Sequence, residues 1–227
     1  MARNSFFLRA FTLIELIVVL AIIAILMSLV YPMYTGISER AKATKDMSNL
    51  RQIGMATQTY LNDNDGVLFA YTASWMSQLN PKYLSSWRIF QSPFDKRSSS
   101  ELGDATTPIS YGVNVRIYPN NAAMFATKIA KPTAFILFAP AQTSAATVNF
   151  QGLATTAAPG VTLLGNNNSV TSNPGGVAAG GTHNGRRRIN ALFADLHCET
   201  MTWTVFANTT AATPGEPDQW TPYVPYP

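Results

Sequence analysis

The chain has 227 residues and a formal net charge of +4, and only 12% of its residues are charged. That charged fraction is low for a cytosolic enzyme, and Arg3 and Arg9 supply two of the positive charges, so the charge balance gives no sign of nucleic-acid binding. The single cysteine, Cys198, excludes an intramolecular disulfide, so packing or bound ions must stabilise the domain if it is exported.

The N-terminus divides into a basic leader and an apolar segment. Residues 1–10, MARNSFFLRA, are short and basic, and residues 16–31, LIVVLAIIAILMSLVY, are apolar apart from Ser28. Together with residues 11–14, the apolar segment is long enough to span a bilayer as a helix. A usual secretory signal has its small residue after the apolar run, whereas Ala10 precedes it. Cleavage after Ala10 would therefore remove only the leader and keep the helix.

Glu15 places a carboxylate at the start of this apolar segment, where an unpaired charge in hydrocarbon costs about 2.5–3.5 kcal/mol. Cleavage before Phe11 would create an α-amine four residues from Glu15. This amine is a natural partner for the carboxylate, either within the chain or from a neighbouring subunit. The alternative is a plain single-pass anchor that tolerates a charge near its end. The residues alone leave both interpretations open.

The stretch FTLIELIVVLAIIAIL after a short basic leader resembles the class III signal of type IV pilins and type II secretion pseudopilins. The resemblance implies that a prepilin peptidase cuts between Ala10 and Phe11 and methylates the new amine of Phe11. It also implies that Glu15 pairs with the N-terminus of a neighbouring subunit during assembly, and that Pro32 bends the helix. Ala10 stands where the family usually has glycine.

Residues 11–34 are thus predicted to form a transmembrane and assembly helix, and residues 35–62 the amphipathic half of the same helix. Apolar and small residues recur there at steps of three and four, while the charged residues are expected mostly on other faces. Gly66 in the stretch NDNDG offers a C-terminal stop. The predicted buried positions are Met47, Leu50, Gly54, Thr57 and Leu61, and the charged positions are Glu39, Arg40, Lys42, Lys45, Asp46 and Arg51.

The same stretch raises the question of a metal. Asp63 and Asp65 are candidates for calcium, because a loop that wraps alternating Asp and Asn side chains can bind this ion. A full EF-hand loop would need a glutamate where Thr72 stands. The alternative is a solvated turn that ends the helix.

Residues 63–227 predict a β-rich head with long loops. Trp75, Leu79, Tyr83 and Leu84 suggest a short helix with one apolar face. Three stretches predict strands: PISYGVNVRIY alternates like a half-buried strand, TAFILFAP reads as a central buried strand, and INALFADLHCETMTW as the last strand. Residues 141–185 are rich in Thr, Ala, Gly and Asn and predict a variable surface loop, with one short strand at GVTLLG.

Alternation along the last strand would place Asp195, His197 and Glu199 on one face. These side chains can bind metals, but with only two histidines in the chain we expect a half-exposed strand with a polar face and no metal site. Arg186, Arg187 and Arg188 (186–188) invite an acidic partner or simply form a solvated hairpin turn.

The stretch THNGRRRINALFADLHCE is similar to a hairpin of large pilin-like proteins of planctomycete and verrucomicrobial type. That group has Asp-Gly where this chain has Asp195 and Leu196, so a turn that requires glycine is not expected here. Ser92 stands where the group often has cysteine. The resemblance implies an α+β fold in which the long helix backs an antiparallel sheet.

Together the resemblances imply a structural subunit without enzymatic activity or a cofactor. Its precursor is expected in the inner membrane with an extracytoplasmic head. Prepilin peptidase and an inner-membrane assembly platform are the expected partners, and the product is a homo-oligomeric helical filament in the periplasm or at the cell surface. The alternatives are a pseudopilin of a type II secretion system and a non-polymerising single-pass membrane protein with an extracytoplasmic binding domain.

Overall fold

A computed structural model of the chain describes residues 11–104, 106–141, 148, 150, 163–164, 180–207 and 219–223. The chain forms two compact units, Met1–Arg40 and Ala41–Pro227. The helix α1 (Leu13–Asp63) runs through the first unit and into the second, which confirms the single long helix predicted from the sequence. The leader and most of the predicted loop 141–185 lie outside the described residues, so their boundaries stay predictions.

The C-terminal end of α1 is set by two residues with left-handed backbone angles. Asp65 has a φ of 52° and Gly66 a φ of 76°. The Gly66 N–H donates to the Leu61 carbonyl oxygen at 2.8 Å and so satisfies one of the last helical acceptors. Gly66 is therefore the stop that the sequence predicts.

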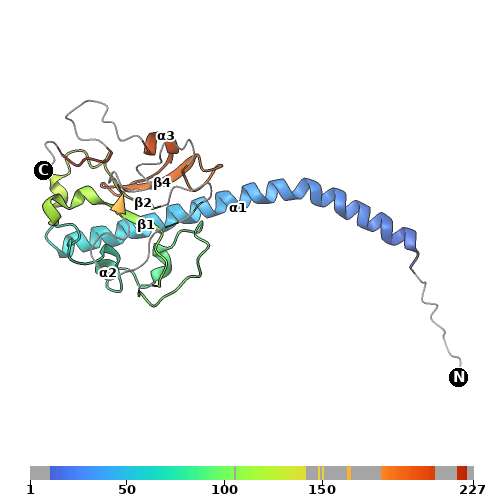
Figure 1. Cartoon of the computed structure of the whole chain (residues 1–227), viewed down its shortest axis with the longest axis horizontal. Coiled ribbons are helices and arrows are strands. Elements are labelled where there is room, and N and C mark those ends of the chain that lie inside the picture. Colours follow the sequence, from blue (N-terminus) through green and yellow to red (C-terminus); the bar gives the residue numbers. More distant parts are fainter. Residues whose placement is uncertain are drawn as a thin grey trace, which may run out of the picture. The chain divides into compact units, whose positions relative to one another are not determined.

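The head is built on an antiparallel sheet that packs against the second half of α1 (Figure 1). The strand order is β3-β1-β2-β4-β5, in which only the two-residue β3 runs parallel to its neighbour β1. Strand β2 is central and buried along its whole length, as predicted, and the fold is α+β. The strands are β1 (Tyr111–Asn114), β2 (Ile136–Pro140), β3 (Leu163–Leu164), β4 (Arg188–Phe193) and β5 (Cys198–Thr202).

The face of α1 toward the sheet follows the predicted spacing. Leu50, Gly54, Thr57 and Leu61 are all buried, and Met47 lies half-buried at the rim. Gly54 matters for this packing, because a Cβ atom there would lie 3.1 Å from Cδ1 of Leu192 on β4. The glycine therefore allows the helix backbone to approach the sheet closely.

The sheet separates two hydrophobic cores, which we call the inner core, against α1, and the outer core, on the opposite face. An irregularity in β2 lets this strand contribute side chains to both cores. The pairing of β2 with β4 shifts register between Ile136 and Phe138. As a result, the consecutive residues Leu137 and Phe138 both join the core against α1, while Ile136 and Ala139 join the core on the other face. The outer core is covered by the short helix α3 (Trp203–Phe206) and by Trp220.

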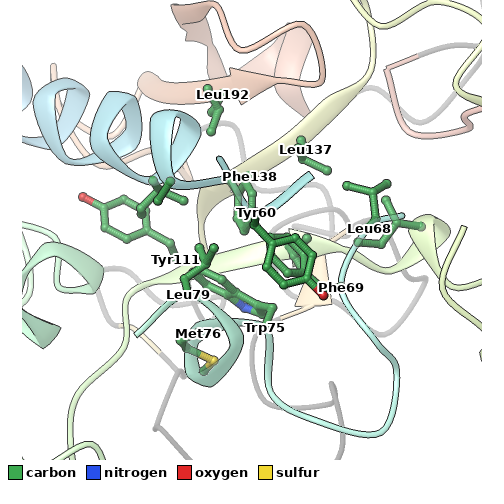
Figure 2. Close-up of a cluster of buried hydrophobic side chains, with 14 of the residues drawn as sticks. Tyr60, Leu68, Phe69, Trp75, Met76, Leu79, Tyr111, Leu137, Phe138 and Leu192 are labelled. Atoms are coloured by element: carbon green, nitrogen blue, oxygen red, sulfur yellow. The ribbon is translucent and has the colours of Figure 1, made fainter. Parts of the chain in front are cut away.

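The inner core centres on aromatic side chains that a short helix brings to the sheet. Helix α2 (Trp75–Leu79) confirms the predicted helical segment and buries Trp75. The Trp75 ring lies 4.7 Å from the Phe138 ring and 5.3 Å, edge to face, from the Phe90 ring. Figure 2 shows Trp75 beside Phe69 and Leu79 in this cluster.

Strand β1 is shorter than predicted and is not half-exposed. It ends at Asn114, and a short 3-10 helix (Val115–Ile117) follows. The Asn114 side chain accepts a hydrogen bond from the Arg116 N–H at 2.9 Å and so caps this turn. All four strand residues are buried, and Tyr111 and Val113 belong to the core against α1.

The predicted last strand is wrong: the stretch forms a hairpin of β4 and β5. Residues 194–197 make the turn, and Leu196 occupies its left-handed position with a φ of 70°. The turn therefore exists without the glycine whose absence led us not to expect it. Leu196 is half-buried against the inner core, and this contact offsets the strain of about 1–2 kcal/mol that a left-handed residue other than glycine carries.

Candidate functional site

The first turn of α1 holds Glu15 in a reciprocal pair with Thr12. One carboxylate oxygen of Glu15 accepts hydrogen bonds from the Thr12 backbone N–H at 2.8 Å and from the Thr12 hydroxyl at 2.7 Å. In return, the Thr12 hydroxyl oxygen accepts from the Glu15 N–H at 3.3 Å. This arrangement is a capping box, in which the threonine and the glutamate three residues later satisfy each other's backbone donors. The Thr-x-x-Glu spacing is the signal in the sequence that predicts this box.

The helix beyond this turn exposes an almost uninterrupted apolar surface. Leu13, Ile14, Met27 and Tyr31 are each more than 60% exposed, and the exposed series continues to Ile37. By length and composition, α1 can cross a membrane. Met27 and Tyr31 also line a shallow apolar hollow with Ala24, Ser28, Val30 and Tyr34. So much apolar surface requires a cover of lipid or of other helices.

A scan against protein families matches the prokaryotic N-terminal methylation motif over residues 9–31. The chain carries a prepilin-type motif. This motif is typical of type IV pilins and pseudopilins, and it spans Ala10, Phe11 and Glu15. Neither the curated proteins nor the solved structures contain a match to the chain.

The motif gives a context to the residues at the start of α1. Phe11 is the first described residue and is 78% exposed, and Ala10 lies outside the described part of the chain. Pro32 lies one residue beyond the matched range, and α1 continues through this position. Cleavage before Phe11, pairing of Glu15 with a neighbour and a bend at Pro32 all stay predictions.

The capping role of Thr12 in the first turn of α1 can be tested by mutation. Thr12→Ala should weaken the first turn by about 1 kcal/mol, because the Glu15 carboxylate and its N–H both lose a partner. First-turn amides of the full chain in detergent should then exchange with deuterium about fivefold faster. Ser28→Ala is the matched control, since Ser28 only donates to the Ile25 carbonyl within the helix. Equal exchange in the two variants would contradict a capping role.

The two candidate calcium ligands, Asp63 and Asp65, lie in different surroundings. The Asp63 carboxylate accepts from the Lys82 ammonium at 2.8 Å and from the Tyr83 hydroxyl at 3.0 Å, and these two hydrogen bonds lower the pKa of Asp63. Asp65 takes a left-handed turn position beside it. Calcium would have to displace Lys82 from Asp63, so the structure gives the calcium prediction no support.

The polar residues of the C-terminal hairpin are also separated. Asp195 and His197 lie in the turn, where Nδ1 of His197 meets the Asp195 carboxylate at 2.5 Å and the imidazole stacks on Phe193. Glu199 lies on β5, so the three do not share a strand face as predicted. In the part of the chain that the structure covers, no three His, Cys, Asp or Glu side chains gather as a metal site.

The arginine triplet lies at the tight turn that leads into β4. Arg186 takes a left-handed backbone angle, with a φ of 65°, and its Nε donates to the Gly181 carbonyl at 3.3 Å. Arg187 and Arg188 are exposed. An acidic partner for this turn stays a prediction.

Asp46 was expected on an exposed face of α1, and this expectation is wrong. Its side chain is fully buried between α1 and the sheet. The carboxylate accepts hydrogen bonds from Ser92, Tyr111 and Asn190, and these four residues are called the Asp46 cluster below. Helical spacing predicts which face a residue lies on but gives no reason to place a carboxylate on the apolar face, so the sequence carried little signal for this cluster.

Proposed function

We propose that the chain is the structural subunit of a type IV pilus-like filament, either extracellular or periplasmic. In this proposal it enters the inner membrane as a precursor with an extracytoplasmic head. Prepilin peptidase then cleaves between Ala10 and Phe11 and methylates Phe11, and an inner-membrane assembly platform builds the filament. The observation that carries the proposal is a prepilin-type motif that continues directly into an exposed apolar helix.

The physical argument for assembly rests on what covers α1. In the membrane, lipid covers the apolar side chains between Leu13 and Tyr31, and in a filament the same side chains would pack against sister helices. The transfer therefore costs little hydrophobic free energy. Glu15 favours the assembled state over the membrane state, because its carboxylate gains a specific partner when the amine of a neighbouring Phe11 approaches.

The first test is the intact mass and the N-terminal sequence of the protein isolated from its native membrane or from shed fibres. We expect a chain that begins at methylated Phe11. A chain that begins at Met1 or Ala2 would mean that Ala10 blocks cleavage, and the non-polymerising membrane anchor would replace the filament subunit. If processing is found, long fibres at the cell surface indicate a pilus, whereas loss of an exported enzyme on deletion indicates a type II secretion pseudopilin.

A further inference from the structure

The Asp46 cluster joins four parts of the head around one carboxylate. Oδ1 of Asp46 accepts from the Ser92 hydroxyl at 2.5 Å and from the Tyr111 hydroxyl at 2.8 Å, while Oδ2 accepts from the Asn190 amide at 2.9 Å. Ser92 follows the 3-10 helix η1 (Trp87–Phe90), Tyr111 begins β1, and Asn190 lies in β4. The cluster therefore links the second half of α1 to the sheet and to the loop beside it.

The three partners of this buried carboxylate are all neutral. Hydrogen bonds from neutral donors stabilise a carboxylate only in part, and a buried charge without a cation carries a large desolvation cost. Burial accordingly raises the pKa of Asp46, against the opposing effect of the bonds from Ser92, Tyr111 and Asn190. The carboxyl group thus favours its neutral form more strongly in the folded head than in the unfolded chain.

The geometry also determines where a proton can bind. Asn190 cannot reverse its role, because its amide N–H also donates to the Ala43 carbonyl at 3.0 Å and its carbonyl oxygen accepts from the Thr200 hydroxyl at 2.7 Å. A proton on Oδ2 would therefore face a fixed donor. Ser92 and Tyr111 carry hydroxyl groups, which rotate and can accept as well as donate. A proton on Oδ1 keeps every member of the cluster bonded.

We propose that Asp46 is a proton-binding switch in the head, which takes up one proton on Oδ1 in mildly acidic solution and thereby tightens the packing of α1 on the sheet. The sign follows from the raised pKa. The stabilising contribution of the neutral carboxyl is complete below its unfolded pKa and is lost as the pH rises through its folded pKa. The head should therefore resist unfolding better in mild acid than at neutral pH.

Other titratable groups surround the cluster and must be separated from Asp46. Tyr111 on β1 has a pKa raised well above its usual value by burial, and burial raises the pKa of Cys198 on β5 to about 11, so neither titrates in acid. The positive charge of Arg51 on α1 opposes the rise in the pKa of Cys198. In the loop after Ser92, Asp95 pairs with Arg97 and accepts from Ser110.

Two histidines of the head also need their own control. His183 is buried, with its ring stacked on Phe94 at 5.8 Å between centroids, and His197 lies in the hairpin turn. A pH-dependent stability alone would not distinguish them from Asp46. The carbonyl stretch of a protonated carboxyl group in the infrared spectrum does, because histidine has no such band.

The experiment follows that band in the full chain in detergent micelles as the pH is lowered from about 7.5 toward the range near pH 4 in which ordinary carboxylates titrate. We expect a protonated carboxyl band to appear in the wild type at a higher pH than the bulk of the carboxylates, to be absent in Asp46→Asn and to persist in Asp63→Asn. The urea midpoint of the wild type should also rise across the range, and Asp46→Asn should remove this rise. A wild type without the band, or a band that survives Asp46→Asn, would overturn the proposal.

A second variant keeps the test decisive if Asp46→Asn does not fold. Tyr111→Phe retains the ring but removes one hydrogen-bond donor to the carboxylate. The ionised form of Asp46 is then less stabilised, so the pKa of Asp46 should rise. The midpoint of the infrared titration should move about one unit toward higher pH. The matched control is Tyr60→Phe, which removes a buried tyrosine hydroxyl bonded to Gln78 and should leave the midpoint in place. An unchanged midpoint in Tyr111→Phe would refute the role of the cluster.

Discussion

Replacing Glu15 with alanine is expected to leave membrane insertion and leader cleavage intact and to lower the yield of assembled filaments by roughly a hundredfold. In the proposed filament, the amine of a neighbouring Phe11 would then be left without a carboxylate in an apolar environment. That loss corresponds to about 2.5–3.5 kcal/mol for each subunit added. The measurement compares sheared fibres with the processed subunit that remains in the membrane.

Two further variants separate the charge of Glu15 from its part in the capping box. Glu15→Gln keeps an oxygen that can accept from Thr12 but removes the charge, so it should assemble as poorly as the alanine variant. Glu39→Ala removes another acid of the same helix, outside the apolar run, and should assemble normally. Normal yield from Glu15→Ala would refute the proposed register role, and normal yield from Glu15→Gln alone would reduce that role to helix capping.

Trp75→Ala is expected to have the largest effect on the head, a loss of about 3–5 kcal/mol in the free energy of unfolding. The Trp75 side chain is 1% exposed and packs against Phe69, Phe90 and Phe138, so its removal leaves a cavity among these rings. Figure 2 shows Trp75 within this cluster. Domains have total stabilities of about 5–15 kcal/mol, so this loss brings the head close to unfolding.

Urea unfolding of the full chain in detergent, followed by near-ultraviolet circular dichroism, measures this loss. Leu102→Ala is the matched control, because Leu102 is also a large apolar residue but is 77% exposed. Its effect should stay within about 0.5 kcal/mol. A similar loss in both variants would mean that the aromatic cluster does not carry the stability of the head.

Much of the fold followed from patterns that report burial over many residues. The long helix, its stop at Gly66 and the central strand β2 were predicted because each has a long periodic or continuous apolar signature. Local features that depend on single side chains were missed. Leu196 adopts a turn position that sequence statistics assign to glycine, and Asn114 ends β1 by capping the next turn.

The functional residues also fall into those that the sequence predicts and those that it does not. The methylation motif is contiguous, so sequence alone located Ala10, Phe11 and Glu15 within it. The Asp46 cluster brings together residues from distant parts of the chain, and no spacing rule connects Asp46 with Asn190. Its chemistry became visible only when the fold placed α1 against β4.

The outer core also bears on the order in which the chain reaches its native state. Trp220 covers that core, and the backbone of Gln219 accepts from the Ile136 N–H at 2.9 Å. Helix α1 precedes β4 and these late residues in the chain, so its Leu50 face and Gly54 cannot pack until distant segments such as Leu192 of β4 have been made. The half-made head is therefore the form most exposed to proteases and to aggregation.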